Sequence, residues 1–199
     1  MNQTSSHYSK TAVVLHWLIA LFLIVMFVLG WFMTELPKDA PKETSFDILN
    51  MGIYTWQVAE EMSPRAFYFN LHKSLGITIF ALIAIRVLWR VTHKPPAFLT
   101  SYSALERKVA TATHHLMYLL MVAIPLTGLL MSIYGKYSVN WFGIELIKGA
   151  DNKGLRDLFE GFHEFVGIVL LVFVALHVLG ALKHKFIDKD DTLKRMSFK

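Results

Sequence analysis

The chain has 199 residues, the length of one ordinary domain, and it is 54% hydrophobic and only 18% charged, with a mean hydropathy of +0.43. Soluble domains average roughly 45–50% apolar and about 25% charged residues, so this composition excludes a soluble or disordered chain and indicates a membrane protein. The lack of cysteine excludes disulfides, iron–sulfur clusters and covalently attached c-type haem, and the net charge of +5 fits basic loops beside a bilayer rather than a nucleic-acid-binding face.

Four apolar runs predict four transmembrane helices. A helix crosses the bilayer core with about 20 apolar residues, fewer where flanking Lys and Arg side chains reach the interface. The first run is too long for the apolar region of a signal peptide, so we expect it to be retained. The predicted spans are residues 11–34, 66–91, 109–134 and 161–183. We therefore predict an all-α integral membrane protein, a single domain over residues 1–199 that folds as an up-down-up-down four-helix bundle.

The distribution of Lys and Arg predicts the orientation. Twelve of the 20 lie in the N-terminal stretch, in the connection 86–108 or in the tail 183–199: Lys10, Arg86, Arg90, Lys94, Arg107, Lys108, Lys183, Lys185, Lys189, Lys194, Arg195 and Lys199. Because positive charge is enriched in cytoplasmic loops, we expect both termini in the cytoplasm. The outer loop 35–65 contains Phe46, Leu49, Ile53 and Trp56 at helical spacing, which predicts a short interfacial helix.

Six histidines lie inside the predicted spans, where an ionisable side chain is costly and indicates a function. His16 and His177 lie near the cytoplasmic ends of the first and fourth spans, and His72 and His163 near the outer ends of the second and fourth. His163 and His177 are separated by about 21 Å along one helix and face nearly the same side. Two such levels are what two non-covalent, bis-histidine b-type haems require in a four-helix bundle.

The 14-residue interval between these two histidines recurs on every span. In the first span 14 residues separate His16 from Gly30, and in the third they separate His114 from Gly128. We expect small residues such as these glycines where a haem meets a helix. In the second span the interval joins His72 to Arg86, which we expect to neutralise a propionate of the cytoplasmic haem.

Spacing leaves the choice of cytoplasmic ligands open. His114 and His115 lie at the same level, so His16, His114, His115 and His177 are all candidates. A lone intramembrane histidine also serves in hydrogen bonding between helices, in a zinc site or in a proton relay. Those alternatives do not explain why two levels each hold two histidines.

Five motifs carry a family resemblance. They are Leu15-His16-Trp17, Leu71-His72-Lys73-Ser74-Leu75-Gly76, His114 to Tyr118 with Pro125 to Gly128, Phe162-His163-Glu164, and Leu176-His177 through His184. Over about residues 5–199 the chain resembles the bacterial cytochrome b561 family, which is related to the cytochrome b subunits of nickel–iron hydrogenases. The resemblance implies that His16 and His177 bind the cytoplasmic haem, that His72 and His163 bind the periplasmic one, and that His114 lies beside the inner haem and a quinone pocket.

The resemblance also implies an oxidoreductase of the bacterial inner membrane, within the respiratory chain, that oxidises periplasmic superoxide and reduces ubiquinone. An anionic substrate needs a positive approach on the acidic outer surface. We expect that funnel from Arg65, Lys73, Lys153 and Arg156. A quinone needs an apolar cleft with polar donors, for which the candidates are His114, His115, Arg86 and Trp89.

Two other functions are alternatives to superoxide oxidation. In the first, the chain is a cytochrome b anchor subunit that relays electrons for a separate dehydrogenase or hydrogenase. In the second, it is a non-redox transporter that binds no haem. In the first case a periplasmic redox protein docks on the long loop 35–65. A homodimer is compatible with each function.

Overall fold

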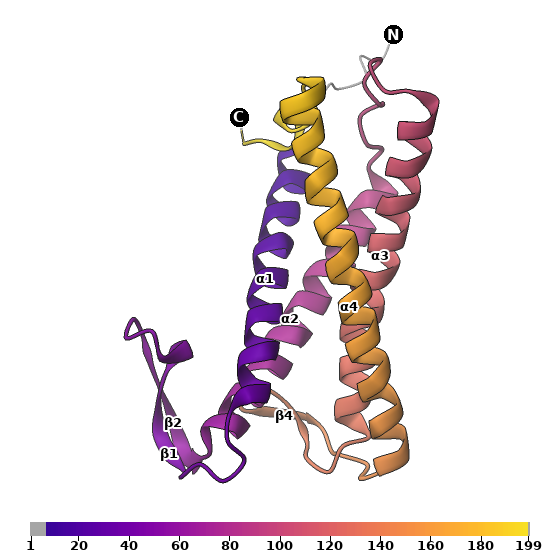
Figure 1. Cartoon of the computed structure of the whole chain (residues 1–199). Helices are drawn as coiled ribbons and strands as arrows, with labels where there is room; N and C mark the ends of the chain where they lie inside the picture. The colour runs from indigo at the N-terminus through magenta and orange to yellow at the C-terminus, as the bar shows by residue number, and fades with distance from the viewer. Residues whose placement is uncertain (1–6, 199) are drawn as a thin grey trace.

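The computed structural model describes residues 7–198, and four long helices make up most of it (Figure 1). All four are long and apolar enough to cross a membrane, which confirms the predicted bundle. We call the end where α1 begins and α4 ends the terminal end, and the opposite end the loop end. The helices are α1 (Lys10–Glu35), α2 (Pro64–Thr92), α3 (Ala104–Ile133) and α4 (Lys153–Lys183).

The helices are longer than the apolar runs because polar caps decide where each one begins. Ser9, Ser63 and Ser103 each accept a hydrogen bond from a backbone N–H in the first turn of α1, α2 and α3. Ser103 and Glu106 form a complete capping box, and Asn152 caps α4. As a result α3 and α4 each begin several residues before the hydrophobic span that they contain.

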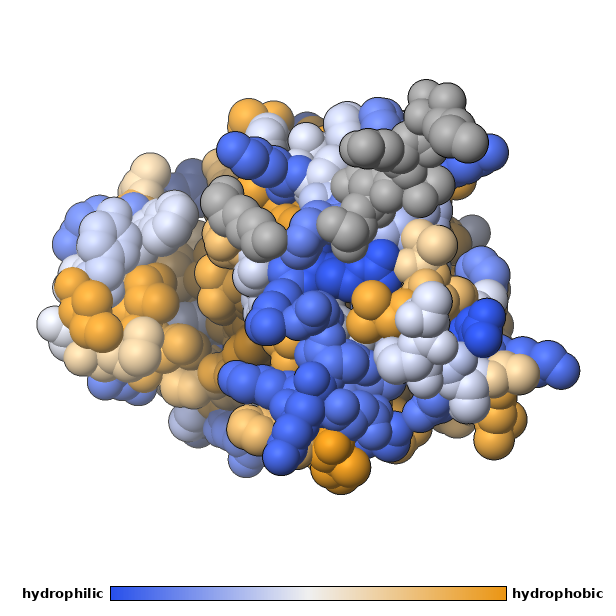
Figure 2. Space-filling view, turned by 90° about the horizontal axis from the view of Figure 1, so that it is seen from above, coloured by the Kyte–Doolittle hydropathy of each residue, from blue (hydrophilic) through white to orange (hydrophobic). Residues whose placement is uncertain are grey.

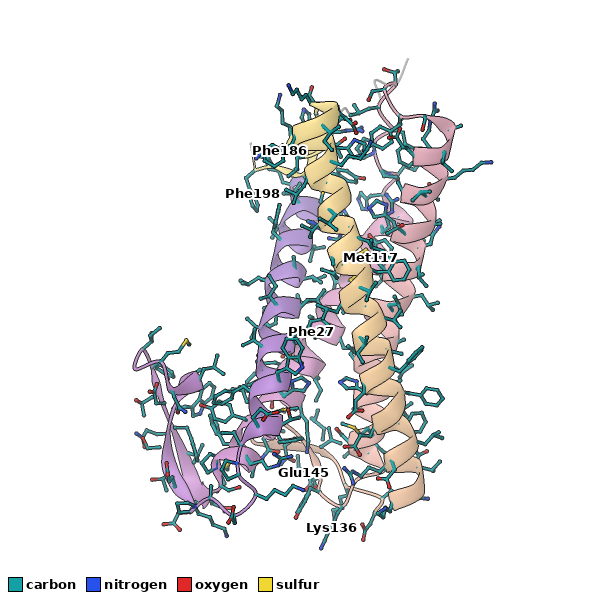
Figure 3. The ribbon with its side chains drawn as sticks, in the orientation of Figure 1. Phe27, Met117, Lys136, Glu145, Phe186 and Phe198 are labelled. Carbon is teal, nitrogen blue, oxygen red and sulfur yellow. The ribbon has the colours of Figure 1, made fainter. Side chains whose placement is uncertain are left out.

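Neighbouring helices in the sequence pack against each other, α1 on α2, α2 on α3 and α3 on α4. A core of buried aliphatic side chains fills the middle of the bundle, and Ile83 and Leu170 are fully buried in it. Phe27 of α1 packs against this core and lies between α1 and α4 (Figure 3). This middle layer is free of charged side chains, so it separates the two ends of the bundle.

The prediction of an interfacial helix within the loop 35–65 is wrong. The segment forms an antiparallel hairpin of β1 (Glu43–Asp47) and β2 (Thr55–Met62), with one helical turn, η1 (Ile48–Asn50), between the strands. Phe46 pairs across the hairpin with Trp56, so both side chains lie on one face without a helix. The chain reverses through three residues with positive φ, namely Leu49, Asn50 and Gly52, and this backbone cannot continue a helix.

The hairpin is attached to α2 by two neighbouring aromatic residues. The ring of Phe46 stacks on that of Phe67 at 4.3 Å. The Tyr68 hydroxyl accepts a hydrogen bond from Leu49 N at 2.9 Å and donates one to the Asp47 carbonyl at 2.7 Å. Because Tyr68 is only 2% exposed, the turn is held against the outer end of α2 by a buried contact.

A second hairpin, β3 (Val139–Trp141) and β4 (Ile144–Ile147), covers the loop end of the bundle (Figure 1). It is bonded to α2, because Ser74 Oγ accepts from Phe142 N at 2.9 Å and Trp141 Nε1 donates to Thr78 Oγ1 at 3.1 Å. The loop end is therefore closed by ordered chain.

The C-terminal segment folds back over the terminal end. After α4 the chain continues through a π-helical turn, η2 (His184–Asp188), and a short 3₁₀ turn, η3 (Lys194–Met196). His184 Nδ1 lies 2.8 Å from Asp190 Oδ2, and its ring stacks on Tyr102 at 4.5 Å. Hydrophilic residues cover much of this end (Figure 2).

We expect Tyr68→Phe to loosen the β1–β2 hairpin. The substitution leaves a buried N–H and a buried carbonyl without their partner, which costs about 1–3 kcal/mol of local stability. Hydrogen–deuterium exchange of the protein in nanodiscs should show faster exchange over residues 47–62. Tyr54→Phe, at an exposed site in the same hairpin, is the control and should leave the rates unchanged. Equal rates in both variants would mean that the Tyr68 hydroxyl does not hold the hairpin.

Candidate functional site

Four of the intramembrane histidines meet as two pairs, and each pair joins α4 to another helix. His16 of α1 faces His177 with the ring centroids 6.1 Å apart and the planes at 68°. His72 of α2 faces His163 with the centroids 6.4 Å apart and the planes at 86°. We call these the terminal-end pair and the loop-end pair. They are separated by about 21 Å along α4, with the apolar middle layer between them.

The ring of His163 is held in one orientation by α3. Its Nδ1 donates a hydrogen bond to the Ile124 carbonyl at 2.8 Å, and the Thr127 hydroxyl lies 3.3 Å from the same nitrogen. Since a carbonyl oxygen only accepts, Nδ1 carries the hydrogen of the neutral ring and Nε2 keeps a lone pair. This is the form in which an imidazole binds a metal.

Gly128 makes room for this ring. A Cβ atom at that position would lie 2.9 Å from His163 Cε1 and 3.0 Å from Nδ1, closer than side chains pack. The sequence predicted small residues where a haem meets a helix, whereas here the glycine lies against the imidazole itself. Gly30 lies similarly beside His72, where a Cβ would be 3.6 Å from Cε1.

His72 completes the loop-end pair with an unsatisfied nitrogen. Its Nδ1 is buried and finds no hydrogen-bond partner among residues 7–198. Buried polar atoms in folded proteins nearly always have a partner, so this ring needs one that the described chain does not supply.

The terminal-end pair has more polar neighbours. Arg86 Nη2 donates to His16 Nδ1 at 3.1 Å, and its guanidinium carbon lies 5.8 Å from the centre of the Tyr118 ring. The ring of His114 lies 5.4 Å from that of His177. His177 therefore faces two other histidines, one from α1 and one from α3.

The spacing within each pair fits two axial ligands of one haem iron. A metal–imidazole bond of about 2 Å on each side places two rings on opposite sides of one metal with their centroids about 6 Å apart. Both pairs match this value, and the His114–His177 contact is shorter. A haem brings its own four nitrogen ligands and needs only two from the protein.

A tetrahedral zinc site fits less well. Such a site takes three or four protein ligands, and each pair offers two imidazoles. In the described part of the chain, the one group of three or more His, Asp or Glu side chains close enough to share a metal is His184, Asp188 and Asp190, outside the pairs. Lys183 Nζ already forms an ion pair with Asp188 at 2.7 Å in that group.

The residues predicted to guide an anion are not equally available. Arg65 donates to the carbonyls of Met33, Thr34 and Leu36, at 2.9–3.2 Å, and so caps the end of α1. Arg156 pairs with Asp157 and Glu160, and Lys153 with the same Asp157.

Lys73 is different. It follows His72 directly, is half-buried, and forms no ion pair with any other residue between 7 and 198. The other three predicted cations are bound by carboxylates of their own helix or by carbonyls at the end of α1, whereas Lys73 is not.

Two candidates for a quinone pocket point away from the terminal-end pair. Trp89 donates to Ser9 Oγ at 3.2 Å and stacks on His93 at 3.7 Å. His115 is exposed and lies in a shallow depression beside Arg107 and Thr111. Arg86 and His114 are the two that lie beside the pair.

Three features of the site were not predicted as such from the sequence. They are the Ile124 carbonyl and the Thr127 hydroxyl, which orient His163, and the Tyr118 ring under Arg86. The nearest sequence signal for the first two was the Pro125-Leu126-Thr127-Gly128 stretch, which lies within α3 and directly follows Ile124. The hydrogen bond from His163 of α4 to the Ile124 carbonyl of α3 could not be predicted, because every residue has a backbone carbonyl and none marks this one.

Comparison with known proteins gives one consistent result. The sequence profile of a family described as prokaryotic cytochrome b561 matches residues 7–199. The chain is 36% identical to cytochrome b561 homolog 2 of Escherichia coli (strain K12), over 97% of this chain and 92% of that protein. It is 26% identical to homolog 1 of the same organism, over 96% and 97%. It is 28% identical to the probable superoxide oxidase CybB of Yersinia pestis, over 95% and 94%.

We expect Gly128→Ala to disturb the loop-end pair specifically. The added methyl group overlaps the His163 ring, and overpacking of this kind costs about 1–3 kcal/mol. The purified variant should show a lower ratio of haem absorbance to protein and a lower melting temperature in detergent. Gly161→Ala on α4 is the matched control, because a Cβ there meets nothing within 4 Å. Equal haem content in the two variants would contradict the role of Gly128.

Proposed function

This chain belongs to the prokaryotic cytochrome b561 family of membrane electron-transfer proteins that bind b-type haem, and we propose on that basis that it carries electrons across the bacterial inner membrane from superoxide to ubiquinone. The single observation that carries the proposal is the meeting of four intramembrane histidines as two pairs with axial-ligand spacing. The name of the Yersinia pestis relative supports superoxide as the donor.

Two haems b are held, one by each pair. His72 and His163 bind the first at the loop end, and His16 and His177 bind the second at the terminal end. The spacing of 6.1 Å favours His16 over His114, at 5.4 Å, as the partner of His177. Because the chain has no cysteine, both haems are bound without a covalent link.

When bound, each haem supplies a one-electron carrier. The protein fixes the two positions and keeps the space between them apolar. α3 holds the His163 ring through the Ile124 carbonyl and so leaves Nε2 with the lone pair that would bind the haem iron. The buried side chains around Ile83 and Leu170 exclude water between the levels.

Arg86 is engaged by His16 in the terminal-end pair. A guanidinium only donates, so in this contact the His16 Nδ1 accepts and the hydrogen of the neutral ring is on Nε2. Binding of a haem iron through Nε2 would need the hydrogen on Nδ1 instead. Arg86 would then give up its hydrogen bond to His16 and be available to neutralise a negatively charged propionate.

Superoxide is oxidised at the loop end. Two superoxide anions each lose one electron and leave as dioxygen, and one ubiquinone takes up the two electrons together with two protons to become ubiquinol. Lys73 draws the anion in, because its charge adjoins the loop-end pair and is unopposed. Arg65, Lys153 and Arg156 contribute less, since each is engaged by carbonyls or carboxylates.

Ubiquinone is reduced at the terminal end. Arg86 and His114 lie beside the His177 ring and are the polar groups best placed to hold the quinone oxygens. The excess of Lys and Arg at this end supports a cytoplasmic location of both termini. One of those cations, Lys199, lies outside the residues that the structure describes.

The His163→Ala and His177→Ala variants should each lose a different haem. The two residues lie on one helix at the two levels, so each substitution removes one axial ligand and spares the other pair. Haem stoichiometry and a redox titration of each purified variant provide the measurement.

His114→Ala is the control for this pair of variants and should keep both haems. Loss of both haems from either single variant while the bundle remains folded would contradict the two-level arrangement. Retention of both haems in His163→Ala and His177→Ala would contradict it equally.

Lys73→Glu should slow the reduction of the protein by superoxide by about tenfold or more, because charge reversal turns attraction of the anion into repulsion. The wild-type rate should also fall as salt rises, since the attraction is screened over about 8 Å at physiological ionic strength. Stopped-flow mixing with superoxide measures both effects.

Lys136→Glu, an exposed charge at the same end of the bundle (Figure 3), is the matched control and should have a smaller effect. The haem spectrum must be unchanged in both variants. A slow, salt-independent reduction of the wild-type protein would exclude superoxide and favour the anchor-subunit function, in which a separate dehydrogenase supplies the electrons.

A further inference from the structure

The turn of the β1–β2 hairpin exposes apolar side chains and carries no charge. Residues 48–58, which we call the hairpin tip, contain no Asp, Glu, Lys or Arg. Met51, Ile53 and Tyr54 are 54%, 78% and 61% exposed. Exposed apolar surface concentrated in this way marks a site that is covered by something else in the native setting.

Charge returns at the base of the hairpin. Lys42 and Glu43 precede the tip, and Glu60 and Glu61 follow it, all of them exposed. Asp47 at the edge of the tip is engaged locally, because its carboxylate accepts the Gly52 N–H at 2.9 Å. The hairpin is therefore polar where it leaves the bundle and apolar at its far end.

The tip points back along the helices instead of away from the bundle. In Figure 1 the hairpin leaves the loop end and turns upward beside α1, so that its turn lies level with the last part of that helix. Leu29 and Met33 of α1 pack in one cluster with Phe46, and Ile48 and Leu49 join the same cluster. Leu29 lies about 9 Å inside the end of α1, within the membrane-spanning segment.

We propose that the hairpin tip inserts into the lipid leaflet at the loop end of the bundle. A lipid leaflet covers the lipid-facing side of α1 and is therefore already present at this depth. Figure 2, seen from the terminal end, shows apolar residues on the separate lobe that the hairpin forms beside the bundle. Tyr54 and Trp56 are the residue types that concentrate at the boundary between hydrocarbon and head groups.

Four backbone N–H groups of the tip have acceptors within the protein. Lipid offers no hydrogen bonds, so polar backbone groups that enter it must be bonded within the protein. Ile48 N donates to the Tyr54 carbonyl, Leu49 N to the Tyr68 hydroxyl, Met51 N to the Ile48 carbonyl and Gly52 N to Asp47. A tip built to bind a protein partner would keep such donors available, as an open strand edge does.

Insertion also has a consequence for α2. Tyr68, which holds the tip, lies one helical turn before His72. A hairpin seated in the leaflet fixes the outer end of α2 laterally and so fixes the backbone that carries this histidine. This inference does not depend on which donor or acceptor the protein uses.

Site-specific labelling tests the proposal directly, because the chain has no cysteine of its own. Ile53→Cys in the tip and Glu60→Cys at the base are each labelled with a nitrobenzoxadiazole fluorophore in the full-length protein in phosphatidylcholine nanodiscs. The label on Ile53→Cys should be quenched severalfold more by lipids carrying a nitroxide near the head group, and severalfold less by aqueous iodide, than the label on Glu60→Cys. An unchanged haem spectrum in both variants shows that the bundle remains intact.

Two results would overturn the proposal. In the first, the Ile53→Cys label is as accessible to iodide as the Glu60→Cys label and is not quenched by the lipid nitroxide. In the second, it is shielded from both quenchers, which would mean that protein covers the tip. Met51→Cys provides a second position in the tip and must give the same result as Ile53→Cys.

Discussion

An imidazole placed within a membrane-spanning segment needs a partner, and the arrangement of the helices around α4 depends on this constraint. Two histidines on one face of α4 reach across to α1 and α2, and the ring centroids lie 6.1 Å and 6.4 Å apart. Helices that are neighbours in the sequence pack directly, and the His16–His177 pair joins α1 to α4 across the bundle.

The two pairs differ in how firmly the protein sets their chemistry. At the loop end, the Ile124 carbonyl and Gly128 fix both the hydrogen and the position of the His163 ring. At the terminal end, Arg86 and His114 offer His16 and His177 additional polar contacts that can be exchanged. A rigid site suits electron uptake from a small diffusing donor, and an adaptable polar site suits a quinone that must also receive protons.

The connections between helices distinguish the two ends further. The β3–β4 hairpin covers the loop end and is bonded to α2 through Ser74. Ser74 follows Lys73, the one predicted anion-guiding cation that neither carboxylates nor helix-end carbonyls engage within the described chain. The β1–β2 hairpin extends sideways with an uncharged tip. The loop end thus combines the cation that we propose attracts a small anion with the tip that we propose inserts into lipid.

The four spans and the depths of the histidines follow from the order of residues alone, because a bilayer demands about 20 apolar residues and a helix rises 1.5 Å per residue. Those two constraints are local, so they can be read along the chain. Contacts between distant segments establish which rings face each other, that Arg65 caps α1, and that loop 35–65 is a hairpin. The spacing of Phe46 and Trp56 is compatible with a helix or a turn, and the stacking of Phe46 on Phe67 of α2, a contact between separate segments, favours the hairpin.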